Sequence, residues 1–120
     1  MKNIIIVTGG AGFVGSNLIA LLLKRTKFKI ISIDNYSTGK IKNHINDSRV
    51  KYIRGNTKNI KKILKKEINK IKTIFHFGEF SRIYQSFLNM NDCIDSNNIG
   101  SHEVFNFCLL NKIKLVYSAT

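Results

Sequence analysis

The chain has no proline and no tryptophan, only two cysteines, and seven acidic residues against twenty basic ones. Two cysteines as far apart as Cys93 and Cys108 exclude a disulfide framework and a cysteine zinc site, so we expect reduced thiols and no metal. No apolar run approaches the ~18–20 residues of a membrane span. The short run at residues 4–7 leads into glycines rather than a cleavage site, so we do not expect a signal peptide. We therefore expect a cytoplasmic protein with no membrane partner.

The shortage of acidic residues leaves a formal net charge of +13, which by itself suggests a nucleic-acid partner. The lysines are densest at residues 57–72, "TKNIKKILKKEINKIK", where apolar residues recur at steps of three and four. These apolar residues are Ile60, Ile63, Leu64, Ile68 and Ile71. Their spacing predicts one buried helix face, so the lysines would cover the solvated face. Because no base-reading motif accompanies them, we expect no nucleic-acid partner.

Strands and helices are predicted to alternate along the sequence. The predicted strands are residues 3–9, 28–34, 50–55, 72–78 and 114–120, and the predicted helices are residues 16–25, 57–72 and 92–112. The strands are apolar along most of their length, which is typical of a parallel sheet covered on both faces. Because 120 residues are too few for two ordinary domains and the sequence shows no domain boundary, residues 1–120 are expected to form one domain.

The strongest local signal is the segment "TGGAGFVGSN" between the first strand and the first helix. Gly9, Gly12 and Gly15 fit T-G-x-x-G-x-x-G, which allows a tight turn, close approach to a pyrophosphate, and close packing of helix on strand. The phosphates then lie at a helix N-terminus, where N–H groups and the dipole favour anions. The alternative is a plain glycine turn. A P-loop ATPase is excluded because no G-K-[ST] follows the glycines.

Asp34 favours the dinucleotide site over the plain turn. It ends the second strand about 20 residues after the loop, where a carboxylate accepts hydrogen bonds from the adenosine ribose of a dinucleotide. The same negative charge repels a 2′-phosphate, so NAD is favoured over NADP. The loop, Asp34 and the order of elements predict an α/β fold, a Rossmann-type doubly wound parallel sheet of five strands in the order 3-2-1-4-5.

With these motifs in this order, the chain resembles the N-terminal part of the extended short-chain dehydrogenase/reductases. The resemblance is to the NAD-dependent nucleotide-sugar epimerase/dehydratase family, of which UDP-glucose 4-epimerase is the best-known member. It covers essentially all 120 residues. Besides the glycine loop, it rests on four segments: "DNYSTG" (34–39), "RGNTKN" (54–59), "FHFGEFSR" (75–82) and "SNNIGS" (96–101).

The resemblance implies that residues from all these segments contact the cofactor NAD. They are Gly9, Gly12, Phe13, Val14, Gly15, Asp34, Asn35, Ser37, Gly39, Asn56, Thr57, Phe77, Gly78, Glu79, Ser81 and Ser96. Asn56 stands where the family usually has Asp beside the adenine. Gly78 and Glu79 replace the usual small pair under the nicotinamide ribose, which indicates a subfamily with a different substrate. His76, in the same segment, is interpreted as a polar residue whose hydrogen bonds are satisfied at a strand end.

The catalytic residues of the family follow the fifth strand. That strand ends in a Ser/Thr cluster whose last member assists a catalytic tyrosine, and the resemblance implies this role for Thr120. The tyrosine belongs to a helical Tyr-x-x-x-Lys further along the chain. "YSTGK" at residues 36–40 fits this pattern in letters only, because it contains Gly39 and follows the second strand directly. We interpret it as a chance match in a loop, and expect an N-terminal portion that is inactive alone.

In the complete enzyme, the resemblance implies transient oxidation of a nucleotide sugar by NAD, and a homodimer as the assembly. Epimerase and dehydratase chemistry both stay open, as does the identity of the sugar. Two functions of other classes also stay open. One is a stand-alone nucleotide-binding module or pseudoenzyme without catalysis, which the departures at Asn56 and Glu79 favour. The other is nucleic-acid binding, which rests on charge alone.

Overall fold

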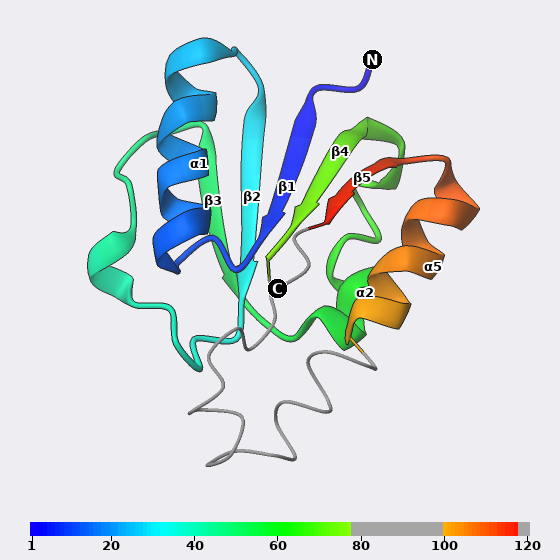
Figure 1. The fold of residues 1–120 in the computed structure, drawn as a ribbon. Helices are drawn as coiled ribbons and strands as arrows, with labels where there is room; N and C mark the ends of the chain where they lie inside the picture. The colour runs from blue at the N-terminus through cyan, green and yellow to red at the C-terminus, as the bar shows by residue number, and fades with distance from the viewer. Residues whose placement is uncertain (78–99, 118–120) are drawn as a thin grey trace.

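The computed structural model of the chain describes residues 1–77 and 100–117, and Figure 1 shows its fold. Within these residues, five strands form one sheet in the order β3-β2-β1-β4-β5, and each neighbouring pair is parallel. The strands are β1 (Ile4–Thr8), β2 (Lys29–Asp34), β3 (Val50–Arg54), β4 (Ile71–His76) and β5 (Lys114–Tyr117). The predicted strand order and direction are confirmed. Of the predicted strand at 114–120, residues 118–120 lie outside the described residues.

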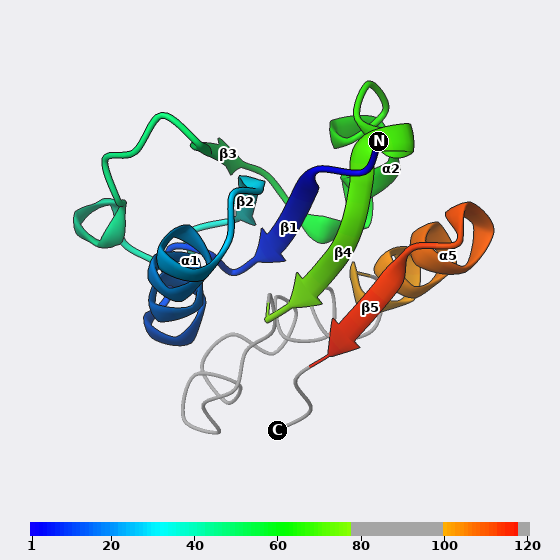
Figure 2. The ribbon, with the colours of Figure 1, turned by 90° about the horizontal axis from the view of Figure 1, so that it is seen from above.

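Helices cover both faces of the sheet. They are α1 (Phe13–Arg25), α2 (Ile60–Ile63) and α5 (Ser101–Asn111), with the 3-10 turns η1 (Ile41–Asn43), η2 (Thr57–Asn59) and η3 (Ile68–Lys70). Figure 2 shows α1 on one side of the sheet and α2 with α5 on the other, which confirms the predicted layers. No helix in the described part of the chain is long and apolar enough to cross a membrane.

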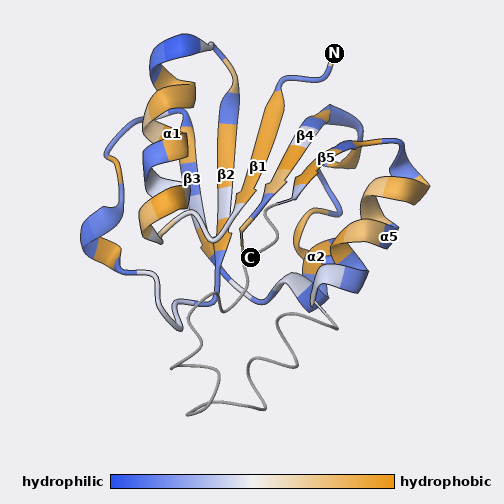
Figure 3. Ribbon diagram, in the orientation of Figure 1, coloured by the Kyte–Doolittle hydropathy of each residue, from blue (hydrophilic) through white to orange (hydrophobic). Residues whose placement is uncertain are grey.

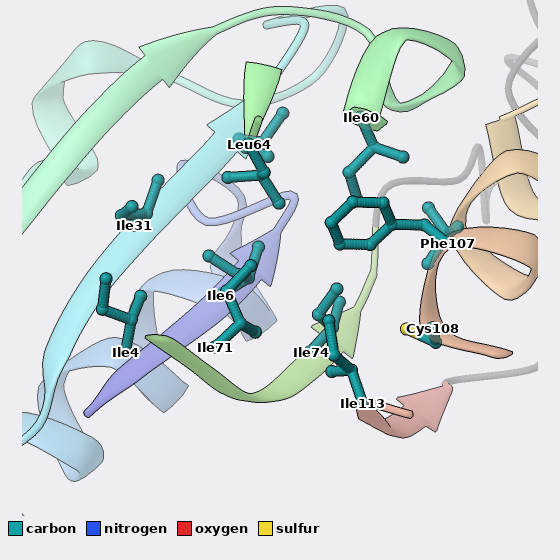
Figure 4. Packing of buried hydrophobic residues seen from close by; sticks show 12 residues of the cluster. Ile4, Ile6, Ile31, Ile60, Leu64, Ile71, Ile74, Phe107, Cys108 and Ile113 are labelled. Carbon is teal, nitrogen blue, oxygen red and sulfur yellow. The ribbon is translucent and has the colours of Figure 1, made fainter. Parts of the chain in front are cut away.

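The sheet separates two apolar cores. The larger core lies under α2 and α5 and consists of Ile4, Ile6, Ile31, Ile33, Ile60, Leu64, Ile71, Ile74, Val104, Phe107, Cys108 and Ile113 (Figure 4). The smaller core lies under α1 and consists of Ile5, Val7, Ile19 and Ile30. Successive β1 residues enter different cores because side chains of a strand alternate between the two faces. This explains why β1 is hydrophobic over most of its length and buried at every position (Figure 3).

The predicted helix over residues 57–72 is wrong in extent. The structure has η2, the four-residue α2, a turn and η3 in this segment, and β4 already begins at Ile71. The predicted apolar face is nevertheless correct, because all five residues assigned to it belong to the larger core or pack against it. Two other helix boundaries also differ. α1 begins at Phe13 rather than residue 16, and the described part of the predicted helix 92–112 is α5.

Cys108 is a free thiol in the larger core, where burial raises its pKa to about 11. A thiol with such a pKa stays protonated and unreactive at neutral pH. This agrees with the expectation of a reduced cysteine, while Cys93 lies outside the described residues. Residues 1–77 and 100–117 contain no group of three or more His, Cys, Asp or Glu side chains that could hold a metal ion.

Candidate functional site

The glycine loop joins β1 to α1 at the carboxyl edge of the sheet. Gly9 has a φ of 73°, a conformation that side chains other than glycine rarely adopt. A Cβ on Gly15 would lie 2.2 Å from the Gly9 carbonyl oxygen, so only glycine allows the helix to start this close to the strand. The loop closes with the Gly12 N–H donating to the Gly9 carbonyl at 3.1 Å. These contacts give the tight turn and the close helix packing that the motif predicts.

The N-terminus of α1 suits an anion. Gly12 is the N-cap residue, no side chain caps the helix, and its first turn holds no acidic residue. The first N–H groups of a helix carry partial positive charge and have no partner within the helix. Phe13 and Val14, the first two helical residues, are 80% and 59% exposed. This end of α1 can therefore receive a phosphate group from solvent.

Asp34 ties the second strand to the glycine loop. Its carboxylate is buried, and Oδ2 accepts a hydrogen bond from the Ala11 N–H at 3.0 Å. Oδ1 accepts from the Tyr36 N–H at 2.8 Å. A Cβ on Gly39 would lie 2.6 Å from Oδ2, and the Lys40 N–H donates to the Ala11 carbonyl at 3.0 Å. The loop after β2 therefore wraps around the carboxylate and holds it against the glycine loop.

A cluster of aromatic and basic side chains lies beside Asp34, and sequence reasoning missed it. The Tyr36 hydroxyl hydrogen-bonds His44 Nε2 at 2.6 Å, and the His44 ring stacks on Tyr52 with centroids 3.8 Å apart. The Arg54 guanidinium lies 4.3 Å from the centroid of the Tyr36 ring. Burial raises the pKa of the Tyr36 hydroxyl, the Asp34 carboxylate raises it further, and Arg54 lowers it. Tyr36 is therefore neutral at physiological pH.

No local sequence pattern predicts the contacts within this cluster. Tyr36 has a φ of 62°, and its ring lies against Arg54, the last residue of β3. Residues 36–40 have no helical conformation, and the Tyr36 hydroxyl is hydrogen-bonded to His44. The prediction that "YSTGK" lies in a loop rather than on a helix is confirmed, while its interpretation as a chance match stays a prediction. The spacing of tyrosine, histidine and arginine over residues 36–54 carries no signal that would have revealed the contact.

The other predicted cofactor residues within the described ranges follow the carboxyl ends of neighbouring strands. Asn56 and Thr57 come after β3, where Asn56 Oδ1 accepts from the Lys58 N–H at 2.9 Å and caps η2. Phe77 follows β4, and its N–H donates to Thr8 Oγ1 at 2.8 Å. Asn35 Oδ1 accepts from the Ser37 N–H at 3.0 Å in the loop after β2.

These positions all lie along one edge of the sheet, on both sides of the point where the strand order reverses between β1 and β4. In open α/β sheets, ligands bind at such an edge and reversal point. The structure therefore brings the predicted glycine loop, the loop after β2, and the ends of β3 and β4 together. Five predicted site residues lie outside the described residues: Gly78, Glu79, Ser81, Ser96 and Thr120.

His76 is satisfied inside the protein, as its interpretation required. It is fully buried, with Nδ1 hydrogen-bonded to Thr8 Oγ1 at 2.7 Å and Nε2 to Ser101 Oγ at 3.0 Å. Its ring also stacks on Tyr117 with centroids 5.5 Å apart. The histidine thus joins β1, β4, α5 and β5 below the site.

Comparison with known proteins identifies this architecture. The model of the NAD dependent epimerase/dehydratase family matches residues 5–120. The UDP-N-acetylglucosamine 4-epimerase from Methanobrevibacter ruminantium, solved with UDP-N-acetylmuramic acid, is 28% identical with a TM-score of 0.81. The match covers 100% of this chain and 39% of that one. An epimerase from Methanothermobacter thermautotrophicus is 25% identical with a TM-score of 0.87, over 99% of this chain and 35% of that one.

A third structure is similar in fold. The UDP-glucose 4-epimerase of Thermus thermophilus, solved in complex with NAD, is 24% identical with a TM-score of 0.81. The match covers 98% of this chain and 37% of that one. The chain therefore spans less than two fifths of the length of each of these three proteins.

Proposed function

The chain belongs to the NAD-dependent epimerase/dehydratase family, and on that premise we propose that residues 1–120 form the NAD-binding Rossmann domain of a nucleotide-sugar epimerase or dehydratase. The complete enzyme would resemble UDP-glucose 4-epimerase. The observation that carries the proposal is the hydrogen bond from the Ala11 N–H to Asp34 Oδ2. It holds a phosphate-binding loop and a ribose-binding carboxylate next to each other, as a dinucleotide requires.

The residues present fit NAD. The N-terminus of α1 would take the pyrophosphate, because it carries no side-chain cap and no acidic residue. A carboxylate has about four lone-pair sites. Asp34 uses two of them for the Ala11 and Tyr36 N–H groups, so both oxygens can still accept from ribose hydroxyls. When bound, NAD supplies reversible hydride transfer, and the protein supplies binding and orientation.

The loops after the strands would hold the rest of the cofactor. We propose adenine contacts from Asn56 and Thr57 after β3, and contacts to the nicotinamide half from the segment that begins at Phe77. Gly78, Glu79, Ser81 and Ser96 are proposed for the same half by family resemblance. Thr120 is proposed to assist the catalytic tyrosine, which would lie with its lysine and the sugar-binding half outside these 120 residues.

The proposed cofactor site is tested by the substitution Asp34→Ala. NAD affinity, measured by titration calorimetry, should fall tenfold to a hundredfold, because a hydrogen bond to a charged group is worth about 1.5–3 kcal/mol. The preference for NAD over NADP should narrow in the same experiment. Asp47→Ala is the matched control, since Asp47 pairs with Arg49 in a loop and should not affect NAD. Equal affinity of the unsubstituted chain for NAD and NADP would contradict the assigned role of Asp34.

An epimerase assay tests the proposal that the catalytic tyrosine and lysine lie outside these 120 residues. The 120-residue chain with saturating NAD should not interconvert UDP-glucose and UDP-galactose, because it contains no helical Tyr-x-x-x-Lys within its described residues and general-base loss costs about 10²–10⁴-fold. Joining it to a family segment that supplies the tyrosine, lysine and sugar-binding half should restore turnover. In that protein, Thr120→Val should lower the rate and leave NAD affinity nearly unchanged. Epimerase activity from the pure 120-residue chain would overturn this part.

A further inference from the structure

Arg54 and Asp34 are direct neighbours at the carboxyl edge of the sheet. Each is the last residue of its strand, and the parallel register pairs Asp34 of β2 with Arg54 of β3. Adjacent strands lie about 4.8 Å apart, and paired residues point to the same face. Ile53 and Ile33 pack against the larger core, so the residues that follow them lie on the face covered by α1. That face is the one from which the glycine loop approaches Asp34.

The Arg54 guanidinium is held by an aromatic ring rather than by the carboxylate. Its central carbon lies 4.3 Å from the Tyr36 ring centroid, well within the ~6 Å range of a cation–π interaction. Among pairs of described residues, the salt bridge found joins Arg49 and Asp47, and Arg54 is not paired with Asp34. Arg54 is also exposed. Its hydrogen-bond donors therefore stay available to a ligand next to Asp34.

The Tyr36 ring is a fixed support for this cation. Its backbone N–H binds Asp34 Oδ1 at 2.8 Å, and its hydroxyl binds His44 Nε2 at 2.6 Å. The His44 ring is in turn stacked on Tyr52, with 8° between the ring planes. The Tyr52 hydroxyl accepts a hydrogen bond from the Ile45 N–H at 2.8 Å, which fixes the last of the three rings. Three rings in contact thus set the position of the guanidinium relative to the carboxylate.

We propose that Arg54, held on Tyr36, is a second determinant of dinucleotide specificity that acts against Asp34 by attracting the 2′-phosphate of NADP. This inference rests on the proposed NAD site. A 2′-phosphate on a ribose bound at Asp34 would be repelled by the carboxylate and attracted by the adjacent guanidinium, which is well suited to phosphate. NAD stays the preferred cofactor. The ratio of the NADP and NAD dissociation constants is smaller than Asp34 alone would produce.

The ratio of the NADP and NAD dissociation constants tests this proposal directly. Both constants are measured by titration calorimetry on the 120-residue chain and on Arg54→Gln. The ratio should rise about tenfold in Arg54→Gln. Tenfold is the lower end of the range expected for loss of one charge-assisted hydrogen bond, because Arg54 is exposed. The change should come from weaker NADP binding, with NAD affinity within about twofold, because NAD has no 2′-phosphate on the ribose that binds at Asp34.

Three matched variants separate the specific role from a general charge effect. Lys51→Gln also removes one exposed cation from β3, but Lys51 pairs with Ile31 and lies three residues from the edge, so the ratio should not change. Tyr36→Phe keeps the ring under Arg54 but loses the bond to His44, so the ratio should rise less than in Tyr36→Leu. Tyr36→Leu removes the ring and should raise the ratio in the same direction as Arg54→Gln.

The outcomes distinguish this proposal from the proposed function. If the folded chain binds NAD but the ratio does not rise in Arg54→Gln, the role of Arg54 is overturned and the NAD site stands. An equal rise in Lys51→Gln would also overturn it, since the effect would then be one of net charge. NADP binding too weak to detect in the unsubstituted chain counts against it as well. If the folded chain binds neither dinucleotide, the proposed function fails and this inference fails with it.

Discussion

At the scale of single residues, the interior of the protein depends on a polar side chain. His76 is fully buried among apolar strands, and both of its ring nitrogens reach hydroxyl groups, on Thr8 and Ser101. Buried polar groups cost little only when all their hydrogen bonds are made. The two hydroxyls lie on β1 and α5, so the histidine connects elements that are distant in sequence. Its removal would leave both partners without this bond in the core.

The substitution His76→Ala should therefore lower the free energy of unfolding by about 2–4 kcal/mol, through lost hydrogen bonds and a cavity. Urea unfolding followed by circular dichroism measures this change. His102→Ala is the control, since His102 is exposed and its ring hydrogen-bonds the helix neighbour Asn106 at 3.1 Å on the surface of α5. It should change the unfolding free energy by less than about 0.5 kcal/mol. Similar effects of both substitutions would show that His76 has no special structural role.

How well residues were predicted depended on whether a local pattern marked them. Asp34 was found because its distance from the glycine loop is fixed by one strand–helix–strand unit. Arg54 was not singled out, because its contact with Tyr36 depends on a positive φ that no residue type at position 36 signals. Side chains placed by loop conformation lie beyond what periodicity and spacing can reveal.

At the scale of elements, the segment between β3 and β4 shows where periodicity is ambiguous. A continuous helix over residues 57–72 would be about 24 Å long, whereas the five-residue β3 spans about 17 Å. Lysines also recur four residues apart, at pairs such as Lys58 and Lys62, and like charges at this spacing destabilise a helix. The chain instead buries Ile60 and Leu64 with one short α-helix and turns back into β4. The pattern predicted which residues are buried, and the geometry of the crossover decided the secondary structure.

The end of α5 is strained, and this strain can be removed. Its C-cap residue, Lys112, has a φ of 54° and a ψ of 45°, the left-handed conformation that usually requires glycine. Lys112→Gly should raise the free energy of unfolding by about 0.5–1 kcal/mol, measured by urea unfolding. Lys114→Gly in the extended strand β5 is the control and should lower it. A loss of stability in Lys112→Gly would contradict the assigned strain.

At the scale of the whole molecule, the parallel direction and the two covered faces followed from the alternation of elements, and the sheet order followed from this alternation together with the glycine loop and Asp34. Three strands on one side of the reversal and two on the other bring four loops to one edge. The same alternation could not place residues 78–99 and 118–120, which lie outside the described residues. The assignments of Glu79 and Thr120 therefore stay predictions based on family resemblance.

The net charge and the exposed apolar surface of this chain have opposite effects on its self-association. Leu109 and Leu110 on α5 are each 77% exposed, and Phe105 on the same helix is 41% exposed. The net charge of +13 keeps copies apart at low ionic strength. The Debye screening length falls from about 30 Å at 0.01 M salt to about 8 Å at 0.15 M. Repulsion between copies therefore weakens with salt, while the attraction between apolar surfaces remains. Self-association of the chain should therefore increase with salt.

Sedimentation velocity at the two salt concentrations measures this association. The double variant Leu109→Gln, Leu110→Gln should remain monomeric at the higher salt. Leu21→Gln on α1, which replaces a 50% exposed leucine, is the control and should associate like the unsubstituted chain. Association that decreases with salt would show that charge pairs rather than apolar contacts hold the copies together.

The two N–H groups that bind the Asp34 carboxylate also bear on the speed of recognition. Because Ala11 and Tyr36 fix both oxygens, the carboxylate and the glycine loop are already arranged when a dinucleotide arrives. A preorganised site needs no slow rearrangement after the encounter, and its backbone moves little. In stopped-flow binding experiments, the signal should therefore change in a single phase. Its observed rate constant should increase in proportion to dinucleotide concentration, without a plateau.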